Sequence, residues 1–224
     1  MNRSVLSALK AVAVLVAITV VSVGILTVCN MFFPKYTPTL DAETARKINS
    51  IAKACDSDEE AFSDGYIVML YEDEIGVSLS EFNKNNKSRK AEILAVYGEP
   101  KGYLTGAFII ESTAEGRDSS IVILSAYKDG ALFGATVKKQ NESYFDKLPD
   151  NLFGSVLGSS GDVDLKADLG KTGATVSLTA INRALNMSNA FALIHGDKVR
   201  EAISARSKAE LQSISSSKKG VRRD

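Results

Sequence analysis

Residues 119–138 read SSIVILSAYKDGALFGATVK and predict a β-hairpin. The pair Asp129-Gly130 lies between two runs rich in β-branched and aromatic residues, Ser119–Tyr127 and Ala131–Lys138. That pair suits a two-residue type I′ turn, because both of its positions need positive φ. Within the first run, Ile121 to Leu124 are apolar without alternation, which indicates a strand covered on both faces.

Further strands are expected upstream of this hairpin, because the same β-branched and aromatic composition recurs there. These runs are Tyr66–Tyr71, Ile75–Leu79, Ala91–Tyr97 and Tyr103–Ser112. Downstream, residues 142–156 contain Pro149 and Gly154 and predict an irregular segment with a short helix, and the GSSG at 158–161 predicts a turn.

Helices are expected on both sides of the strands. Asp41 is a candidate N-cap for a helix that ends near Cys55. A second helix is predicted from Thr175, with Gly196 as its stop and Asp197 as the N-cap of a third. The apolar stripe of the second helix consists of Leu178, Ile181, Leu185, Ser188 and Ala192, and the third helix carries Val199, Ile203, Leu211 and Ile214. The predicted fold class is therefore α+β, a single mixed domain with antiparallel hairpins and C-terminal helices.

The N-terminus carries 19 uncharged residues from Ala11 to Cys29. A helix of this length spans roughly 28 Å, which is close to the hydrocarbon thickness of a bilayer. Pro34 follows, preceded and followed by aromatic residues of the kind found at a membrane interface. A cleaved signal peptide would need a shorter apolar region and small residues at the cut, which Cys29 to Phe33 do not supply. We therefore expect an uncleaved transmembrane signal anchor.

The predicted segments are an N-terminus at 1–10, the anchor at 11–33, a linker and connecting helix at 34–65, the domain at 66–214 and a flexible basic tail at 215–224. The whole chain has 27 basic and 27 acidic residues among 224. Without the two basic residues of the first 33, and the four basic and one acidic of the last seven, 21 basic and 26 acidic residues remain. No basic excess points to nucleic acid, and two cysteines exclude a disulfide scaffold and a four-cysteine metal site.

A polar, glycine-containing segment directly precedes the predicted helix at Thr175. It runs Asp168-Leu169-Gly170-Lys171-Thr172-Gly173-Ala174-Thr175-Val176-Ser177. Its Gly-Lys-Thr is not a phosphate-binding P-loop, because that motif needs a glycine at position 165, which is leucine.

The pattern Asp-x-x-x-Ser/Thr-Gly-Ala-Thr in this segment resembles the flavinylation motif of the FMN-binding domain family. That family includes membrane-anchored flavin carriers of the Rnf electron transport complex and of the sodium-translocating NADH:quinone reductase. Chain length and the order of anchor, connecting helix, hairpin, motif and helix resemble the Rnf carrier, RnfG, more closely. Family members often carry a Glu-Thr-Pro-Gly-Leu-Gly type loop after the hairpin, where this chain has Lys139-Gln140-Asn141-Glu142-Ser143-Tyr144-Phe145.

The resemblance implies a covalent FMN, bound through its phosphate to the hydroxyl of Thr175. It implies that an ApbE-type flavin transferase recognises Asp168, Thr172, Gly173 and Ala174, and that the last three, with Ser177, lie against the cofactor. The partners that it implies are the lipid bilayer and other membrane subunits of an Rnf-type complex. The domain would lie on the extracytoplasmic side of the cell membrane.

The chain would then be a redox subunit of an ion-translocating ferredoxin:NAD oxidoreductase and not an enzyme by itself. Two alternatives stay open: a stand-alone extracytoplasmic flavoprotein of another electron-transfer chain, and an anchored binding or sensing module without a cofactor. His195, the only histidine, is expected to interact with the end of a helix and not to act as a catalytic base.

Overall fold

The computed structural model describes residues 12, 14, 16, 18–23, 67–100, 106–166 and 174–220, with side chains to residue 212. The chain forms two compact units, residues 1–37 and 38–224. In the first unit the described residues are helical. Among the residues that the structure describes, no helix has both the length and the apolar character to cross a bilayer. Most of the predicted anchor and the whole predicted helix at 41–55 lie outside the described residues.

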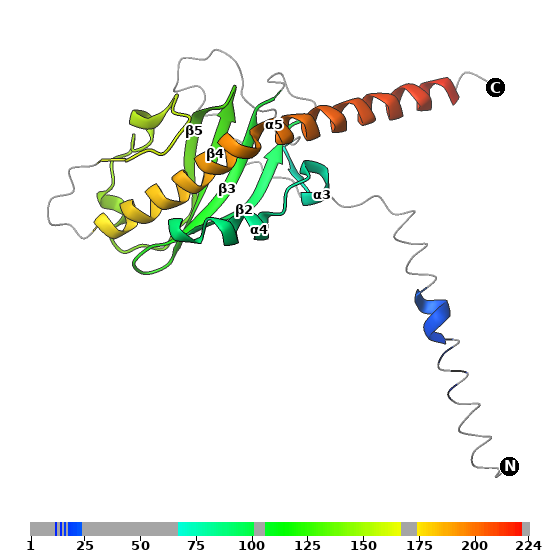
Figure 1. Cartoon of the computed structure of the whole chain (residues 1–224), viewed down its shortest axis with the longest axis horizontal. Helices are drawn as coiled ribbons and strands as arrows, with labels where there is room; N and C mark the ends of the chain where they lie inside the picture. The colour runs from blue at the N-terminus through cyan, green and yellow to red at the C-terminus, as the bar shows by residue number, and fades with distance from the viewer. Residues whose placement is uncertain are drawn as a thin grey trace, which may run out of the picture. The chain divides into compact units, whose positions relative to one another are not determined.

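The second unit is built on a five-stranded antiparallel sheet (Figure 1), which confirms the α+β class and the antiparallel hairpins. Its strands follow one another in chain order: β1 (Val68–Leu70), β2 (Ala91–Gly98), β3 (Phe108–Glu115), β4 (Ser120–Lys128) and β5 (Ala131–Lys139). The first strand is shorter than predicted. Strand β3, predicted to end at Ser112, continues three residues farther, because its polar end pairs with β4 as far as Glu115 opposite Ser120.

The predicted hairpin joins β4 to β5, with Lys128 opposite Ala131. Asp129 has φ 52° and Gly130 has φ 82°, so both turn residues adopt the positive φ that the sequence predicts. In β4, Ile121 and Ile123 belong to the main hydrophobic cluster and Leu124 to a second one. The run without alternation therefore marks a strand with buried residues on both faces.

The predicted strand at Ile75–Leu79 is wrong. The chain there forms two short helices, α3 (Glu72–Ile75) and α4 (Leu79–Asn85). Gly76 ends the first with a left-handed φ of 60°, and the Ser78 hydroxyl caps the second by accepting a hydrogen bond from the amide of Glu81. Local caps therefore decide this segment, although Ile75 and Val77 are buried as the apolar pattern suggests.

The described part of the domain also contains three single turns of 3₁₀ helix: η1 (Lys87–Arg89), η2 (Phe145–Lys147) and η3 (Gly154–Val156). The last two lie in the segment predicted to be irregular with a short helix.

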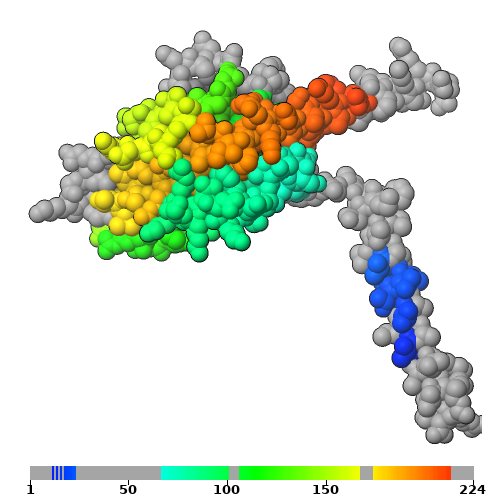
Figure 2. Space-filling view, viewed as in Figure 1, coloured from blue at the N-terminus to red at the C-terminus, as the bar shows by residue number. Residues whose placement is uncertain are grey.

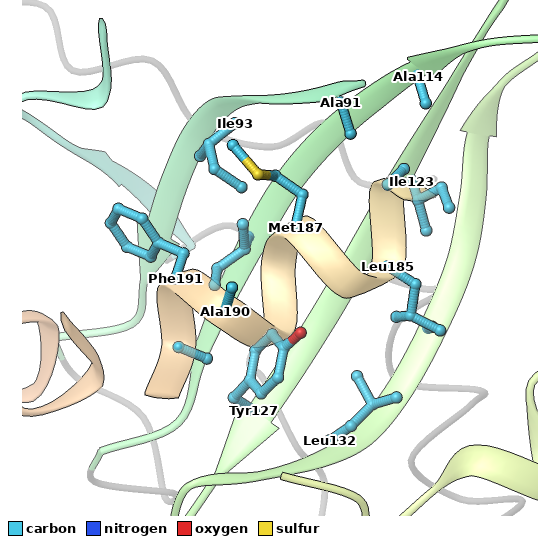
Figure 3. Packing of buried hydrophobic residues seen from close by; sticks show 14 of the residues in the cluster. Ala91, Ile93, Ala114, Ile123, Tyr127, Leu132, Leu185, Met187, Ala190 and Phe191 are labelled. Carbon is cyan, nitrogen blue, oxygen red and sulfur yellow. The ribbon is translucent and has the colours of Figure 1, made fainter. Parts of the chain in front are cut away.

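The long helix α5 (Thr175–Gly220) packs across the sheet. All five residues of its predicted stripe are buried, which confirms the face that the periodicity assigns to the core. Figure 3 shows Leu185, Met187 and Phe191 of this helix directed toward sheet residues such as Ile93 and Ile123.

The predicted stop at Gly196 and the N-cap at Asp197 are wrong, because α5 continues without a break to Gly220 and replaces the predicted pair of C-terminal helices. A Cβ at Gly196 would lie 3.4 Å from the Phe108 ring, so the glycine lets the helix approach β3. A helical glycine costs about 1 kcal/mol, and burial of Val199 and Ile203 farther along the helix outweighs that cost. The first six residues of the predicted tail belong to this helix; residues 221–224 lie outside the described residues.

Candidate functional site

The end of the motif begins α5. Thr175 is the first residue of the helix and is exposed, whereas Ala174 before it and Ser177 after it are buried. The amide of Leu178 donates to the carbonyl of Ala174 at 2.9 Å, which closes the first helical turn. Asp168, Lys171, Thr172 and Gly173 lie outside the described residues, so the structure places Ala174, Thr175 and Ser177 of the predicted site.

The position of Thr175 combines access with a favourable electrostatic field. Amides in the first turn of a helix lack intrahelical acceptors, and the helix dipole adds partial positive charge there. The carbonyl of Thr175 accepts a hydrogen bond from the Thr179 hydroxyl at 2.8 Å, on the same side of α5. Among the described residues, no hydrogen bond involves the Thr175 hydroxyl itself. The arrangement therefore presents a hydroxyl to solvent at a place that favours an anion.

Glu142 fastens this first turn to the sheet. Its Oε2 accepts hydrogen bonds from the Ser177 hydroxyl at 2.8 Å and from the amide of Arg117 at 2.9 Å. Its Oε1 accepts from the amides of Asp118 at 2.9 Å and Ser119 at 2.8 Å. One carboxylate thus joins the loop after β5, the β3–β4 turn and the start of α5.

The hydrogen bonds of Glu142 stabilise its charged form. Burial opposes ionisation, but the four donors outweigh that cost and lower the pKa of Glu142 from 4.5 to about 2. The Ser177 hydroxyl donates its hydrogen bond to this carboxylate. Ser177 therefore supports the first turn of α5 from its buried side. The sequence offers no signal for Glu142, since its partners lie 23 to 35 residues away in the chain.

The loop after β5 is held at a second point. Asp118 Oδ2 accepts from the amide of Ser143 at 2.9 Å, and this bond lowers the pKa of the Asp118 carboxyl. The Arg117 guanidinium lies over the Tyr144 ring, 5.2 Å from its centre. Side-chain contacts of Asp118 and Arg117 therefore hold this loop.

Three asparagines on α5 hold the segment that leads toward the motif. Asn182, Asn186 and Asn189 are spaced four and three residues apart, so they line one side of the helix. Their amides bind the backbone of alternate residues of the extended segment 161–165, here called the asparagine-bound segment. The bonds are Leu165 N to Asn182 Oδ1 at 2.8 Å, Asn182 Nδ2 to Leu165 O at 3.2 Å, Val163 N to Asn186 Oδ1 at 2.7 Å, Asn186 Nδ2 to Val163 O at 2.8 Å and Asn189 Nδ2 to Gly161 O at 2.7 Å.

The asparagine-bound segment runs antiparallel to α5, because its later residues pair with earlier residues of the helix. It therefore carries the chain toward the N-terminal end of α5, where the motif meets Thr175. The asparagine spacing is visible in the sequence, but it identifies no partner there, so these three residues could not be named in advance.

His195 lies inside α5 and not at a helix end, so its predicted interaction with a helix terminus is wrong. Its ring packs 5.5 Å from the centre of Phe82 and 5.2 Å from that of Phe191. Burial and the nearby Lys198 lower the pKa of His195. This histidine is part of the packing between α4 and α5.

Comparison with protein-family models, with curated proteins and with solved structures finds no match for this chain. Its function must therefore be inferred from its own residues.

Proposed function

We propose that this chain is a membrane-anchored electron-transfer protein that carries FMN covalently, through a phosphoester bond to the Thr175 hydroxyl. The observation that carries the proposal is the position of Thr175. It is the last residue of the motif that begins at Asp168, and it is the exposed first residue of a long, well-packed helix.

The described residues fit the attached group. A phosphodiester keeps one negative charge, and such a charge at a helix N-terminus gains about 0.3–1 kcal/mol. Ala174 has only a methyl side chain and is buried, so nothing bulky precedes the acceptor. Glu142 is also anionic, but four donors already neutralise much of its field.

The attachment needs a second protein, because a threonine hydroxyl is a poor nucleophile without an activating base or metal. In the proposed reaction the Thr175 oxygen bonds to the phosphorus on the flavin side of a dinucleotide pyrophosphate. The pyrophosphate bond breaks, a nucleoside monophosphate leaves, and the hydroxyl proton passes to the transferase. The exposure of Thr175 suits such access by an ApbE-type enzyme.

When bound, the flavin supplies reversible uptake and release of electrons, and the protein holds and positions it. We propose that residues 11–33 anchor the chain in the cell membrane with the domain on the extracytoplasmic side. Electrons would pass between neighbouring membrane subunits of an Rnf-type ion-translocating complex. A stand-alone flavoprotein of another chain would use the same site with different partners.

The proposal is tested with the full chain, produced in cells together with the flavin transferase. We expect a band that fluoresces under ultraviolet light on a denaturing gel and a mass increase of one FMN in the intact chain. Thr175→Val should lose both signals, because it keeps the side-chain shape and removes the hydroxyl.

Thr179→Val is the matched control, one turn along on the same side of α5, and should keep both signals. A native chain without the fluorescent band and the mass increase would overturn the proposal and favour the module without a cofactor. A Thr175→Val chain that still gains the FMN mass would show that the acceptor lies elsewhere.

A further inference from the structure

A groove of about 540 Å³ lies along the outer side of α5, away from the sheet. Thr179, Asn182, Arg183 and Asn186 of the helix form its floor. One wall is Ser88–Arg89 of η1, and the other is Val163–Asp164 of the asparagine-bound segment. The outer side of α5 faces the viewer in Figure 2, where the helix crosses the domain.

At the end of the groove farther from Thr175, an ion pair joins η1 to the asparagine-bound segment. Arg89 reaches over α5 and donates to Asp162 Oδ1 at 2.7 Å and to the carbonyl of Asn186 at 3.5 Å. The Asn182 and Asn186 amides are engaged with the asparagine-bound segment, so floor and wall hold each other in place. The groove is therefore preformed in this fold.

Arg183 is the charged group of the groove for which the described residues supply no partner. Its guanidinium makes no hydrogen bond or ion pair with any side chain or backbone group in the described part of the chain. It also lines a neighbouring hollow that contains Lys87 and Lys90, with Glu92 and Glu115 as the acidic groups there. The groove itself contains Arg89 and Asp164 as its other charges, and both are paired, Arg89 with Asp162 and Asp164 with Lys166.

The end of the groove that Thr179 lines is the end nearer to the proposed attachment point. Thr179 lies one helical turn from Thr175 and is bonded to its carbonyl at 2.8 Å. A ribityl chain of five carbons, with bonds of about 1.5 Å, reaches on the order of 7 Å. One helical turn is about 5.4 Å. The reach of the ribityl chain therefore exceeds the rise along α5 from Thr175 to Thr179.

We propose that this groove receives the isoalloxazine ring of the flavin, with the Arg183 guanidinium beside the carbonyl edge of the ring. This inference rests on the proposed function. A planar guanidinium presents donors that match the acceptors of a planar heterocycle. The Val163 side chain and the methyl group of Thr179 offer apolar contact to the faces of the ring.

The test uses the full chain, loaded with FMN by the transferase in the cell, and three variants. Arg183→Gln removes the charge, and Thr179→Phe fills the floor of the groove. Arg117→Gln is the control, because it removes the other guanidinium close to the start of α5, at Tyr144. Intact mass reports loading, and quenching of flavin fluorescence by neutral acrylamide reports exposure of the ring.

We expect one FMN on every chain. Quenching should rise about threefold or more in Arg183→Gln and in Thr179→Phe, since a site that holds a ligand buries about 70% or more of the ligand surface. The midpoint potential should become more negative in Arg183→Gln, because a nearby cation favours the electron-rich form of the ring. Arg117→Gln should match the native chain in both measurements.

The outcomes separate the two proposals. Loaded variants with unchanged quenching and potential would overturn the groove while the attachment to Thr175 stands. A rise in quenching confined to Arg117→Gln would also overturn it, because the ring would then lie at Tyr144. A native chain that gains no FMN overturns the attachment and the groove together.

Discussion

The first turn of α5 and the middle of the same helix are built in opposite ways. In the middle, Phe191 and its neighbours are fully buried against the sheet, and van der Waals contacts hold the helix there. In the first turn Thr175 is exposed, the Ser177 hydroxyl donates to the Glu142 carboxylate, and Asn182 accepts from the amide of Leu165. The packed middle of α5 therefore holds the helix in place, and its first residue presents an exposed hydroxyl.

The largest effect should follow a cavity in the middle of α5. Phe191→Ala removes a fully buried ring, which also packs at 5.0 Å against Phe82. We expect a loss of about 3–5 kcal/mol in the free energy of unfolding, measured by urea denaturation of the detergent-solubilised chain. A loss below about 1 kcal/mol would contradict the packing of the helix on the sheet.

Acid should weaken the first turn through Glu142. Because its folded pKa of about 2 lies below the ordinary 4.5, its contribution is full above pH 4.5 and is lost as the pH falls toward 2. With screening by solvent included, the loss should be roughly 2–3 kcal/mol, and Glu142→Gln should flatten that part of the stability–pH curve. Asp118→Asn is the comparison, because Asp118 Oδ2 accepts from the amide of Ser143, in the loop after β5 and not in α5.

Gly98→Ala tests the packing of the later part of α5 on β2. A Cβ at Gly98 would lie 2.5 Å from Cγ1 of Ile203, on the part of α5 that the sequence assigned to a separate helix. We expect destabilisation by about 1–3 kcal/mol in the same urea experiment. An unchanged midpoint would mean that Ile203 does not pack on β2.

The smallest loss of stability should come from the asparagine-bound segment. Asn186→Ala removes two hydrogen bonds to Val163, so we expect about 1 kcal/mol of destabilisation. Hydrogen exchange of the Val163 amide should become faster, while exchange in β3 and β4 stays unchanged. Equal acceleration throughout the sheet would show that the effect is global and not local to this segment.

The sequence predicted the parts of the fold that repeat a local pattern. Asp129-Gly130 with its flanking strands and the stripe of α5 are such cases, because hairpin chemistry and helical period act over a few residues. The predicted helix stop at Gly196 was wrong, because the glycine there allows a close contact with Phe108. The predicted strand at Ile75–Leu79 was wrong, because the helix caps at Gly76 and Ser78 outweigh the strand pattern.

In the candidate site, too, local patterns could be read from the sequence and contacts between distant segments could not. Thr175 could be named from the motif, and its place at the start of a helix follows from the stripe after it. Glu142 and Arg183 could not be named as site residues, because their surroundings are made by segments distant in sequence. The groove exists only once η1 and the asparagine-bound segment lie beside α5.

The central claim is that the first residue of α5 is a covalent attachment point. The most direct measurement is tandem mass spectrometry of the peptide containing residue 175, from the full chain produced with and without the flavin transferase. We predict one FMN phosphoryl group on the Thr175 hydroxyl when the transferase is present, and the unmodified peptide when it is absent. An unmodified Thr175 in both samples, or FMN on Thr172 or Thr179, would contradict the claim.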